Sequence, residues 1–143
     1  MSEGPIIVSS CLLGIKCRHD GTDAYDKEIA ESGDEHVPVC PEELGGLGTP
    51  RNTAEIKGGD GWEVVLGSTN VIDSEGTDVT DKFVKGGETV LKMARMTGAK
   101  RAILKEGSPS CGVKFIKQDG EDVPGPGVTA AMLEGEGIKT EGR

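Results

Sequence analysis

Three of the four cysteines in this chain follow short apolar runs that have the composition of β-strands. The runs are Pro5–Ser10, His36–Val39 and Arg101–Leu104. Short apolar runs bounded by turn-forming residues are typical of buried strands. The carboxyl ends of parallel strands meet at one edge of a sheet, and ligands bind at that edge in open α/β folds. The sequence therefore predicts that Cys11, Cys40 and Cys111 meet in one crevice.

The rest of the chain alternates between helical and strand-like patterns. Residues spaced for one helix face predict a long helix that Gly98 ends; they are Phe83, Gly87, Val90, Leu91 and Ala94. We also expect helices within Tyr25–Ser32 and Thr129–Gly135, and strands at Trp62–Leu66, Thr69–Asp73 and Val113–Lys117. Pro38 suits the end or edge of a sheet. The alternation favours an α/β fold: a single domain over residues 1–143, with a mostly parallel, Rossmann-like sheet, flanking helices, and the cysteines on loops at the C-terminal strand edge.

Charge and hydropathy narrow the classes of partner. Twenty-five acidic against sixteen basic residues give a net charge of −9, which argues against a nucleic acid or an anionic membrane as the main partner. No run approaches the roughly 18 apolar residues of a spanning helix. Met1–Pro5 also lacks the basic start and apolar stretch of a signal peptide. We expect a cytoplasmic protein, in which the thiols are buried, metal-binding or catalytic rather than paired in disulfides.

The cysteine spacing leaves several kinds of site open. The one close pair is Cys11 and Cys17, and no C-x-x-C motif occurs; a zinc site would need help from His19 or His36. An iron–sulfur cluster fits three thiols better, because thiolates are its normal ligands and three of them leave one iron open. The ferredoxin spacing is absent, so such a site must form from distant loops. Each cysteine also has the plainer interpretation of a small buried residue.

The cysteine loops carry other groups suited to chemistry. Glu42 and Arg51 lie in the loop after Cys40, and Ser108 and Ser110 surround Cys111 with hydroxyls and backbone N–H groups that suit an anion. Asp20 lies in the loop after Cys11. Each loop taken alone is also explained by ordinary turn formation.

Three ordered motifs extend this pattern over most of the chain. They are Ser9-x-Cys11-Leu-Leu-Gly-x-x-x-Arg18-x-Asp-Gly21, Cys40-Pro-Glu-x-x-Gly-Gly-Leu-x-x-Pro-Arg51 and Lys105-x-x-Ser-Pro-Ser-Cys-Gly112. Together they resemble the thiouracil desulfidase (TudS-like) family, catalogued as domain of unknown function 523. The segment from Gly127 to Ile138 is similar to the closing helix and strand of that family.

The resemblance implies a cofactor and its ligands. It implies a single α/β domain that carries a 4Fe-4S cluster on Cys11, Cys40 and Cys111, with an open fourth iron able to carry hydrosulfide. The implied activity is removal of sulfur, as hydrogen sulfide, from a thiocarbonyl small molecule such as 2-thiouracil. That reaction is non-redox Lewis-acid chemistry at the open iron.

The hydrolysis also needs a base and groups that orient the reactants. Glu42 is our first candidate for the base that activates water, and Asp20 is the second. Ser108 and Ser110 are expected to orient the substrate or to hydrogen-bond the hydrosulfide.

Two positions depart from the family pattern. Cys17 is a further thiol that can be a spare group, a sulfur acceptor or a fourth ligand, and His19 replaces a more usual Tyr. The alternatives to an enzyme are a sulfur carrier or cluster-delivery protein, and a metal-binding domain without turnover. We expect a small-molecule partner, no nucleic acid and no membrane, and a monomer or homodimer.

Overall fold

A four-stranded sheet forms the centre of the molecule. The computed structural model describes residues 4–143, so the expectation for Met1–Pro5 falls mostly on residues outside the described part. The sheet has the order β2-β1-β5-β8, and every pairing in it is parallel. Its strands are β1 (Ile6–Ser9), β2 (His36–Val39), β5 (Arg101–Leu104) and β8 (Lys139–Gly142). The predicted α/β fold with a parallel sheet is confirmed.

Strand β1 is central and covered on both faces. All four of its residues are buried, and Ile7 pairs with Val37 on one side and Ala102 on the other. A parallel sheet with both faces covered has continuous apolar strands of this kind. Strand β2 is an edge strand, as Pro38 indicated, because proline has no N–H for a further ladder.

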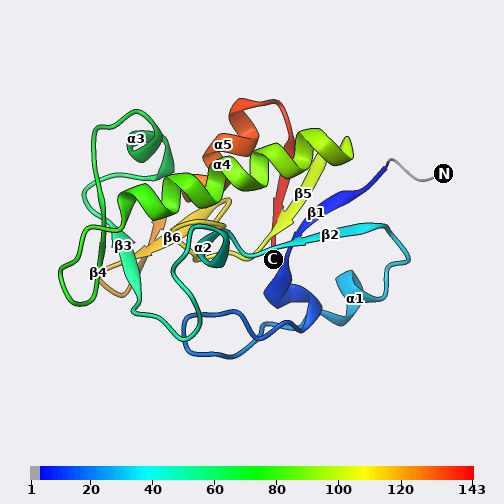
Figure 1. The fold of residues 1–143 in the computed structure, drawn as a ribbon, viewed down its shortest axis with the longest axis horizontal. Helices are drawn as coiled ribbons and strands as arrows, with labels where there is room; N and C mark the ends of the chain where they lie inside the picture. The colour runs from blue at the N-terminus through cyan, green and yellow to red at the C-terminus, as the bar shows by residue number, and fades with distance from the viewer. Residues whose placement is uncertain (1–3) are drawn as a thin grey trace.

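Helices cover the two faces of the sheet (Figure 1). Helices α4 (Thr80–Thr97) and α5 (Val128–Gly135) lie on one side, and the short elements η1 (Ser10–Leu13) and α1 (Lys27–Ala30) lie on the other. Two separate groups of buried side chains fill these interfaces. The larger includes Ile7, Val90, Ala94, Leu104 and Leu133, and the smaller includes Ile6, Val8, Leu12, Ile29 and Ile103.

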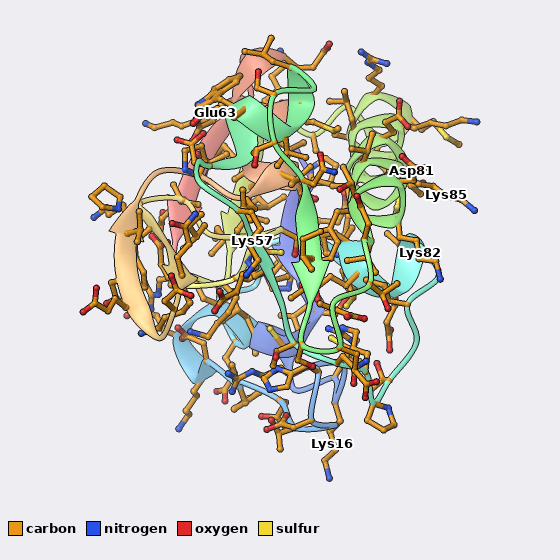
Figure 2. The ribbon with its side chains drawn as sticks, turned by 90° about the vertical axis from the view of Figure 1, so that its left-hand side faces the viewer. Lys16, Lys57, Glu63, Asp81, Lys82 and Lys85 are labelled. Carbon is orange, nitrogen blue, oxygen red and sulfur yellow. The ribbon has the colours of Figure 1, made fainter. Side chains whose placement is uncertain are left out.

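Helix α4 follows the predicted pattern closely. Phe83, Val90 and Ala94 are buried, and Gly98 ends the helix in the left-handed conformation at φ 75°. Asp81, Lys82 and Lys85 project from its outer side (Figure 2). The short helix α2 (Pro41–Leu44), which begins just after Cys40, packs against α4.

Two antiparallel ribbons stand beside the sheet (Figure 1). Strand β3 (Ala54–Ile56) pairs with β4 (Val71–Asp73), and β6 (Phe115–Gln118) pairs with β7 (Glu121–Pro124). Strand β4 confirms the strand expected at Thr69–Asp73, and β6 begins two residues later than expected. Strand β7 was not predicted, because its sequence Glu-Asp-Val-Pro is charged and mostly exposed.

The strand expected at Trp62–Leu66 is wrong, because this segment belongs to helix α3 (Gly61–Val65). Asp60 accepts a hydrogen bond from the backbone N–H of Trp62, and the Glu63 side chain accepts one from the N–H of Asp60. Such a capping box supplies the N–H partners that a helix start lacks. Local capping therefore overrides the β-propensity of Trp-Glu-Val-Val. Among the described residues, no helix is long and apolar enough to cross a membrane.

Candidate active site

One cavity of about 470 Å³ opens at the carboxyl ends of β1 and β2, and Cys11, Cys40 and Cys111 all line it. Cys11 lies in η1 directly after β1, and Cys40 follows β2 and begins α2. Cys111 lies in the loop between β5 and β6. The structure therefore brings together three thiols that are far apart in the sequence, as the strand pattern predicted.

Cys17 is a fourth thiol at the same cavity. Cys17 is only 3% exposed, whereas its neighbour Lys16 points outward from the loop (Figure 2). Cys17 lines the cavity together with Cys11 and Cys40. The Cys17 carbonyl oxygen also accepts a bond from the Cys40 thiol, with 3.7 Å between Sγ and O. Cys17 is therefore part of the thiol cluster.

Contacts among the thiols separate their acidities. The hydrogen bond from Cys17 lowers the pKa of Cys11 despite its burial. The same bond raises the pKa of Cys17 to about 11, because the proton that it donates is retained. The contact with Cys17, and then burial, raise the pKa of Cys40. Without a bound metal, Cys11 is therefore the readiest of these three to become a thiolate.

Cys111 is a buried thiol at the same cavity, 5% exposed. Burial raises its pKa to about 12, and hydrogen bonds from the hydroxyls of Ser9 and Ser110 oppose this rise. The distance from Ser110 Oγ to Cys111 Sγ is 3.7 Å. An inserted metal would replace the thiol proton and offset the cost of a buried thiolate.

Glu42 faces the thiols with both carboxylate oxygens held. Arg51 Nε donates to Oε1 at 3.0 Å, and the two side chains are only 7% and 14% exposed. Ser110 Oγ donates to Oε2 at 2.9 Å, and Ser108 Oγ donates to the same oxygen at 3.3 Å. Burial by itself would lower the pKa of Arg51, but the Glu42 carboxylate raises it overall, so Arg51 stays charged.

The loop with Ser108 and Cys111 is held by its own side chains. Ser108 Oγ accepts hydrogen bonds from the backbone N–H groups of Ser110 and Cys111, both at 3.1 Å. Glu106 Oε1 accepts from the N–H of Val113 at 2.8 Å and of Lys114 at 3.0 Å. These bonds fix the direction in which the loop presents its hydroxyls and its thiol.

Asp20 is not brought to this cavity. It is exposed in a turn, where its carboxylate accepts hydrogen bonds from the N–H and the hydroxyl of Thr22, and these bonds lower its pKa. His19 does line the cavity. His36 lies at the start of β2, hydrogen bonded to Ser32.

Comparisons with known proteins agree with this arrangement. A model of the 2-thiouracil desulfurase family matches residues 6–141. The chain belongs to that family. The uncharacterized protein YbbK of Bacillus subtilis (strain 168) is 44% identical over 139 residues, which cover 94% of this chain and 92% of YbbK. The solved structure of the [4Fe-4S]-dependent thiouracil desulfidase TudS is 37% identical, with a TM-score of 0.84 over 99% of this chain and 91% of that one. The resemblance inferred from the motifs is thus confirmed.

The donor set of this family member suits a group larger than one ion. Within residues 4–143, no three His, Cys, Asp or Glu side chains are placed to hold a single metal ion. Three thiols nevertheless line one cavity of about 470 Å³. Thiolates are the normal ligands of iron–sulfur clusters, so the chemistry of this donor set suits such a cluster.

Sequence reasoning missed several residues at this site. Ser9 and Glu106 contact the cysteine loops, and the cavity is also lined by Thr53, which precedes β3, and by Phe115 and Lys117 of β6. The sequence could have indicated Ser9, because it begins the first motif two residues before Cys11. The ribbon residues gave no signal, because strand pairing alone brings them to the cavity.

Proposed function

We propose that this chain is a 4Fe-4S-dependent desulfidase that hydrolyses a thiocarbonyl small molecule such as 2-thiouracil to the carbonyl compound and hydrogen sulfide. The observation that carries the proposal is one cavity lined by the three proposed ligand thiols, a largely buried carboxylate and two hydroxyls. The family of the chain, and its likeness to TudS over nearly its whole length, support it.

Cys11, Cys40 and Cys111 would hold the cluster through their sulfur atoms. They come from three separate loops and line the same cavity. When bound by three thiolates, such a cluster supplies one iron without a protein ligand, a Lewis acid with affinity for sulfur.

Glu42 is the proposed general base. The reaction adds water to the thiocarbonyl carbon and releases the sulfur, so that C=S and H₂O become C=O and H₂S. Glu42 Oε2 takes a proton from the attacking water and gives it to the sulfur, and the proton of the new hydroxyl follows by the same route as C=O forms and the C–S bond breaks. Arg51 holds the other carboxylate oxygen, Oε1, which leaves Oε2 turned toward the serines.

Ser108 and Ser110 orient the reactants beside that carboxylate. Their Oγ atoms are 2.9 Å apart, and both donate to Glu42 Oε2. A water bound among these three side chains would receive and donate hydrogen bonds in fixed directions, which lowers the entropic cost of its attack. Asp20 has no part in this proposal, because it is exposed and bonded to Thr22.

The surroundings of the site fit a small substrate in a reducing compartment. Free thiols and an open iron persist where disulfide formation is suppressed, and we therefore assign the activity to the cytoplasm. The cavity volume of about 470 Å³ lies in the range for small ligands. Whether the protein is a monomer or a homodimer stays a prediction.

Anaerobic reconstitution tests the proposal. We expect a broad visible absorption band and roughly four irons per chain, lost when Cys11, Cys40 or Cys111 is changed to Ala. The loaded protein should release sulfide from 2-thiouracil at a catalytic rate. A colourless protein, or one that binds a single zinc, would refute the desulfidase function.

A sulfur carrier is the second candidate, and the fourth thiol favours it. Cys17 lines the same cavity as the three proposed ligands and is a thiol that the hydrolysis does not use, and in a carrier the sulfur would stay at the sulfide level and pass to a partner protein. The two functions differ in one measurement: an enzyme releases many equivalents of sulfide with no partner protein present, whereas a carrier stops after one.

A further inference from the structure

Phe115 is a large apolar side chain that does not belong to the hydrophobic core. It begins β6 and packs into none of the groups of buried apolar side chains in the described part of the chain. Its neighbour Ile116 is fully buried, and successive side chains of a strand point to opposite faces. Phe115 and Lys117 therefore lie on the face of β6 away from the core, and both line the cavity. Nothing in the proposed hydrolysis uses the Phe115 ring.

Backbone hydrogen bonds hold Phe115 on both sides of the residue. Its carbonyl oxygen accepts from the N–H of Gly107 at 3.3 Å, and its own N–H donates to Glu106 Oε1 at 3.5 Å. Its backbone also pairs with Pro124 in the ribbon of β6 and β7. A side chain whose backbone is fixed before binding loses less conformational freedom when a ligand contacts it.

The ring lies beside the loop that carries the two serines of the site. Gly107 has a positive φ of 84°, and a Cβ atom built there would lie 3.5 Å from Phe115 Cε2, so the ring is in contact with the backbone of this loop. Gly107 directly precedes Ser108, whose Oγ is 3.3 Å from Glu42 Oε2. The ring therefore borders the hydroxyls and the carboxylate to which the proposed reaction is assigned.

A phenyl ring at this place suits a flat aromatic ligand. The four Phe, Tyr and Trp residues all lie in the described part of the chain, and among them Phe115 alone lines the cavity. Stacking of a nucleobase on an aromatic side chain typically strengthens binding by about fivefold to a hundredfold. A smaller acyclic compound covers less of the ring and gains less.

We infer that Phe115 is a specificity-determining residue: the planar heterocycle of the substrate stacks on its ring, so that the site selects aromatic cyclic thiocarbonyl compounds over acyclic ones. The inference deepens the proposed function and rests on it for the reaction. Binding of the heterocycle itself requires only the cavity and the ring.

The two phenylalanines of the chain allow a direct test in the wild-type protein. Phe83 is buried in the core at 1% exposed, whereas Phe115 lines the cavity. NMR of reconstituted protein with 13C-labelled phenylalanine rings should resolve both residues, with Phe115→Leu as the assignment. Uracil, which has no sulfur to release, should shift the Phe115 ring signals and leave those of Phe83 unchanged. Dihydrouracil, whose ring is saturated and puckered, should shift them less.

Kinetics of loaded variants test the selection of substrate. Phe115→Leu should raise KM for 2-thiouracil by about fivefold to a hundredfold with kcat little changed, because stacking stabilises the bound substrate and the transition state alike. Thiourea has the same N–C(=S)–N group without the ring, and its kcat/KM should stay near that of the wild type. Phe115→Tyr, which keeps an aromatic face, should restore most of the KM. Trp62→Leu is the matched control, because Trp62 is also partly exposed, at 38%, and does not line the cavity.

The outcomes separate this inference from the proposed function. Wild-type protein that shows the uracil shift at Phe115 but releases no sulfide refutes the desulfidase and supports the stacking. Active wild type with equal kinetics for Phe115→Leu and Trp62→Leu refutes the role of Phe115. An equal loss of kcat/KM for 2-thiouracil and thiourea also refutes it, because general damage to the site has that effect.

Two further results are decided by other measurements. If the wild type releases no sulfide from thiourea, the rescue by Phe115→Tyr decides, and a KM as high as that of Phe115→Leu refutes the inference. If Phe115→Leu fails to fold or to take up iron, the uracil titration of the wild type decides. A shift confined to one of the two phenylalanines supports the inference, and a shift of neither or of both refutes it.

Discussion

Glu42 is set apart from the acidic residues around it by its partners. Its neighbour Glu43 is exposed and contacts Thr49, whereas Glu42 is held between Arg51 and the two serines. A charged pair so well buried is costly unless both members are bonded, and here both are. The sequence indicated Glu42 by its distance from Cys40, and only the fold supplied its bonds.

Replacing Glu42 tests its role as the base. Glu42→Gln should keep the cluster and lower kcat by about 10²–10⁴-fold, because a neutral amide cannot accept the proton of water. Iron content and sulfide release measure the two effects separately. Glu43→Gln is the matched control and should keep full turnover. Full turnover in loaded Glu42→Gln would remove Glu42 from the mechanism.

The cysteine acidities give a prediction for the protein without its cluster. The hydrogen bond from Cys17 lowers the pKa of Cys11, so Cys11 has more thiolate at a given pH than Cys17, whose pKa is about 11. Alkylation of the metal-free protein should therefore begin at Cys11, at a lower pH than at Cys17. Peptide mass spectrometry over a range of pH measures the rates. Cys17→Ala should move the Cys11 reaction to higher pH, and an unmoved profile would contradict the assigned hydrogen bond.

Helices α2 and α4 pack with their backbones unusually close. A Cβ atom on Gly86 would lie 2.0 Å from the carbonyl oxygen of Pro41, and one on Gly45 would lie 2.0 Å from that of Lys82. Both helices therefore need glycine at the contact. Since α2 begins just after Cys40 and includes Glu42, this contact also sets the position of the site.

Gly86→Ala tests that contact. Alanine favours a helix by about 1 kcal/mol over glycine. Overpacking against the Pro41 backbone should outweigh this gain, with a net loss of about 1–3 kcal/mol in the free energy of unfolding. Denaturant unfolding measures it, and sulfide release should fall because Glu42 shifts. Glu88→Ala, on the exposed side of α4, should stay within about 0.5 kcal/mol of the wild type. A stabilised Gly86→Ala protein would contradict this prediction, because it would mean that α2 and α4 move apart to make room for the methyl group.

The elements that were predicted well are those with local signals. Helix α4 has a regular apolar face and a terminal glycine, and β1, β2 and β5 have short apolar runs. Helix α3 was predicted as a strand because Val64 and Val65 favour strands. The capping box formed by Asp60 and Glu63 is the signal that indicates a helix. Strand β7 is charged and exposed, and pairing with β6 forms it.

The molecule as a whole has few large side chains for its core. It contains two Phe, one Trp and one Tyr in 143 residues, and Trp62 and Tyr25 are partly exposed. The three cysteine loops meet at the cavity, which leaves buried thiols where apolar packing would otherwise be. A group bound to all three loops would connect segments that are distant in the sequence.

Cluster binding should therefore stabilise the whole domain. A ligand that binds only the folded state raises its stability by mass action, so the loaded protein should melt at a higher temperature than the metal-free protein. Anaerobic thermal melts followed by circular dichroism measure the difference. Cys111→Ser should abolish the difference by preventing loading. Equal melting temperatures for loaded and metal-free wild type would contradict this prediction.

Local sequence patterns were enough to predict the α/β class, the three strands that lead to cysteines, and the motifs of the family. These follow from local patterns, because apolar runs and helix faces are written in neighbouring residues. Tertiary structure decided which groups the thiols and the carboxylate contact. Ser110 reaches Glu42 across 68 positions, and Ser9 reaches Lys105 across 96. Such contacts depend on strand order and helix packing, which no local pattern specifies.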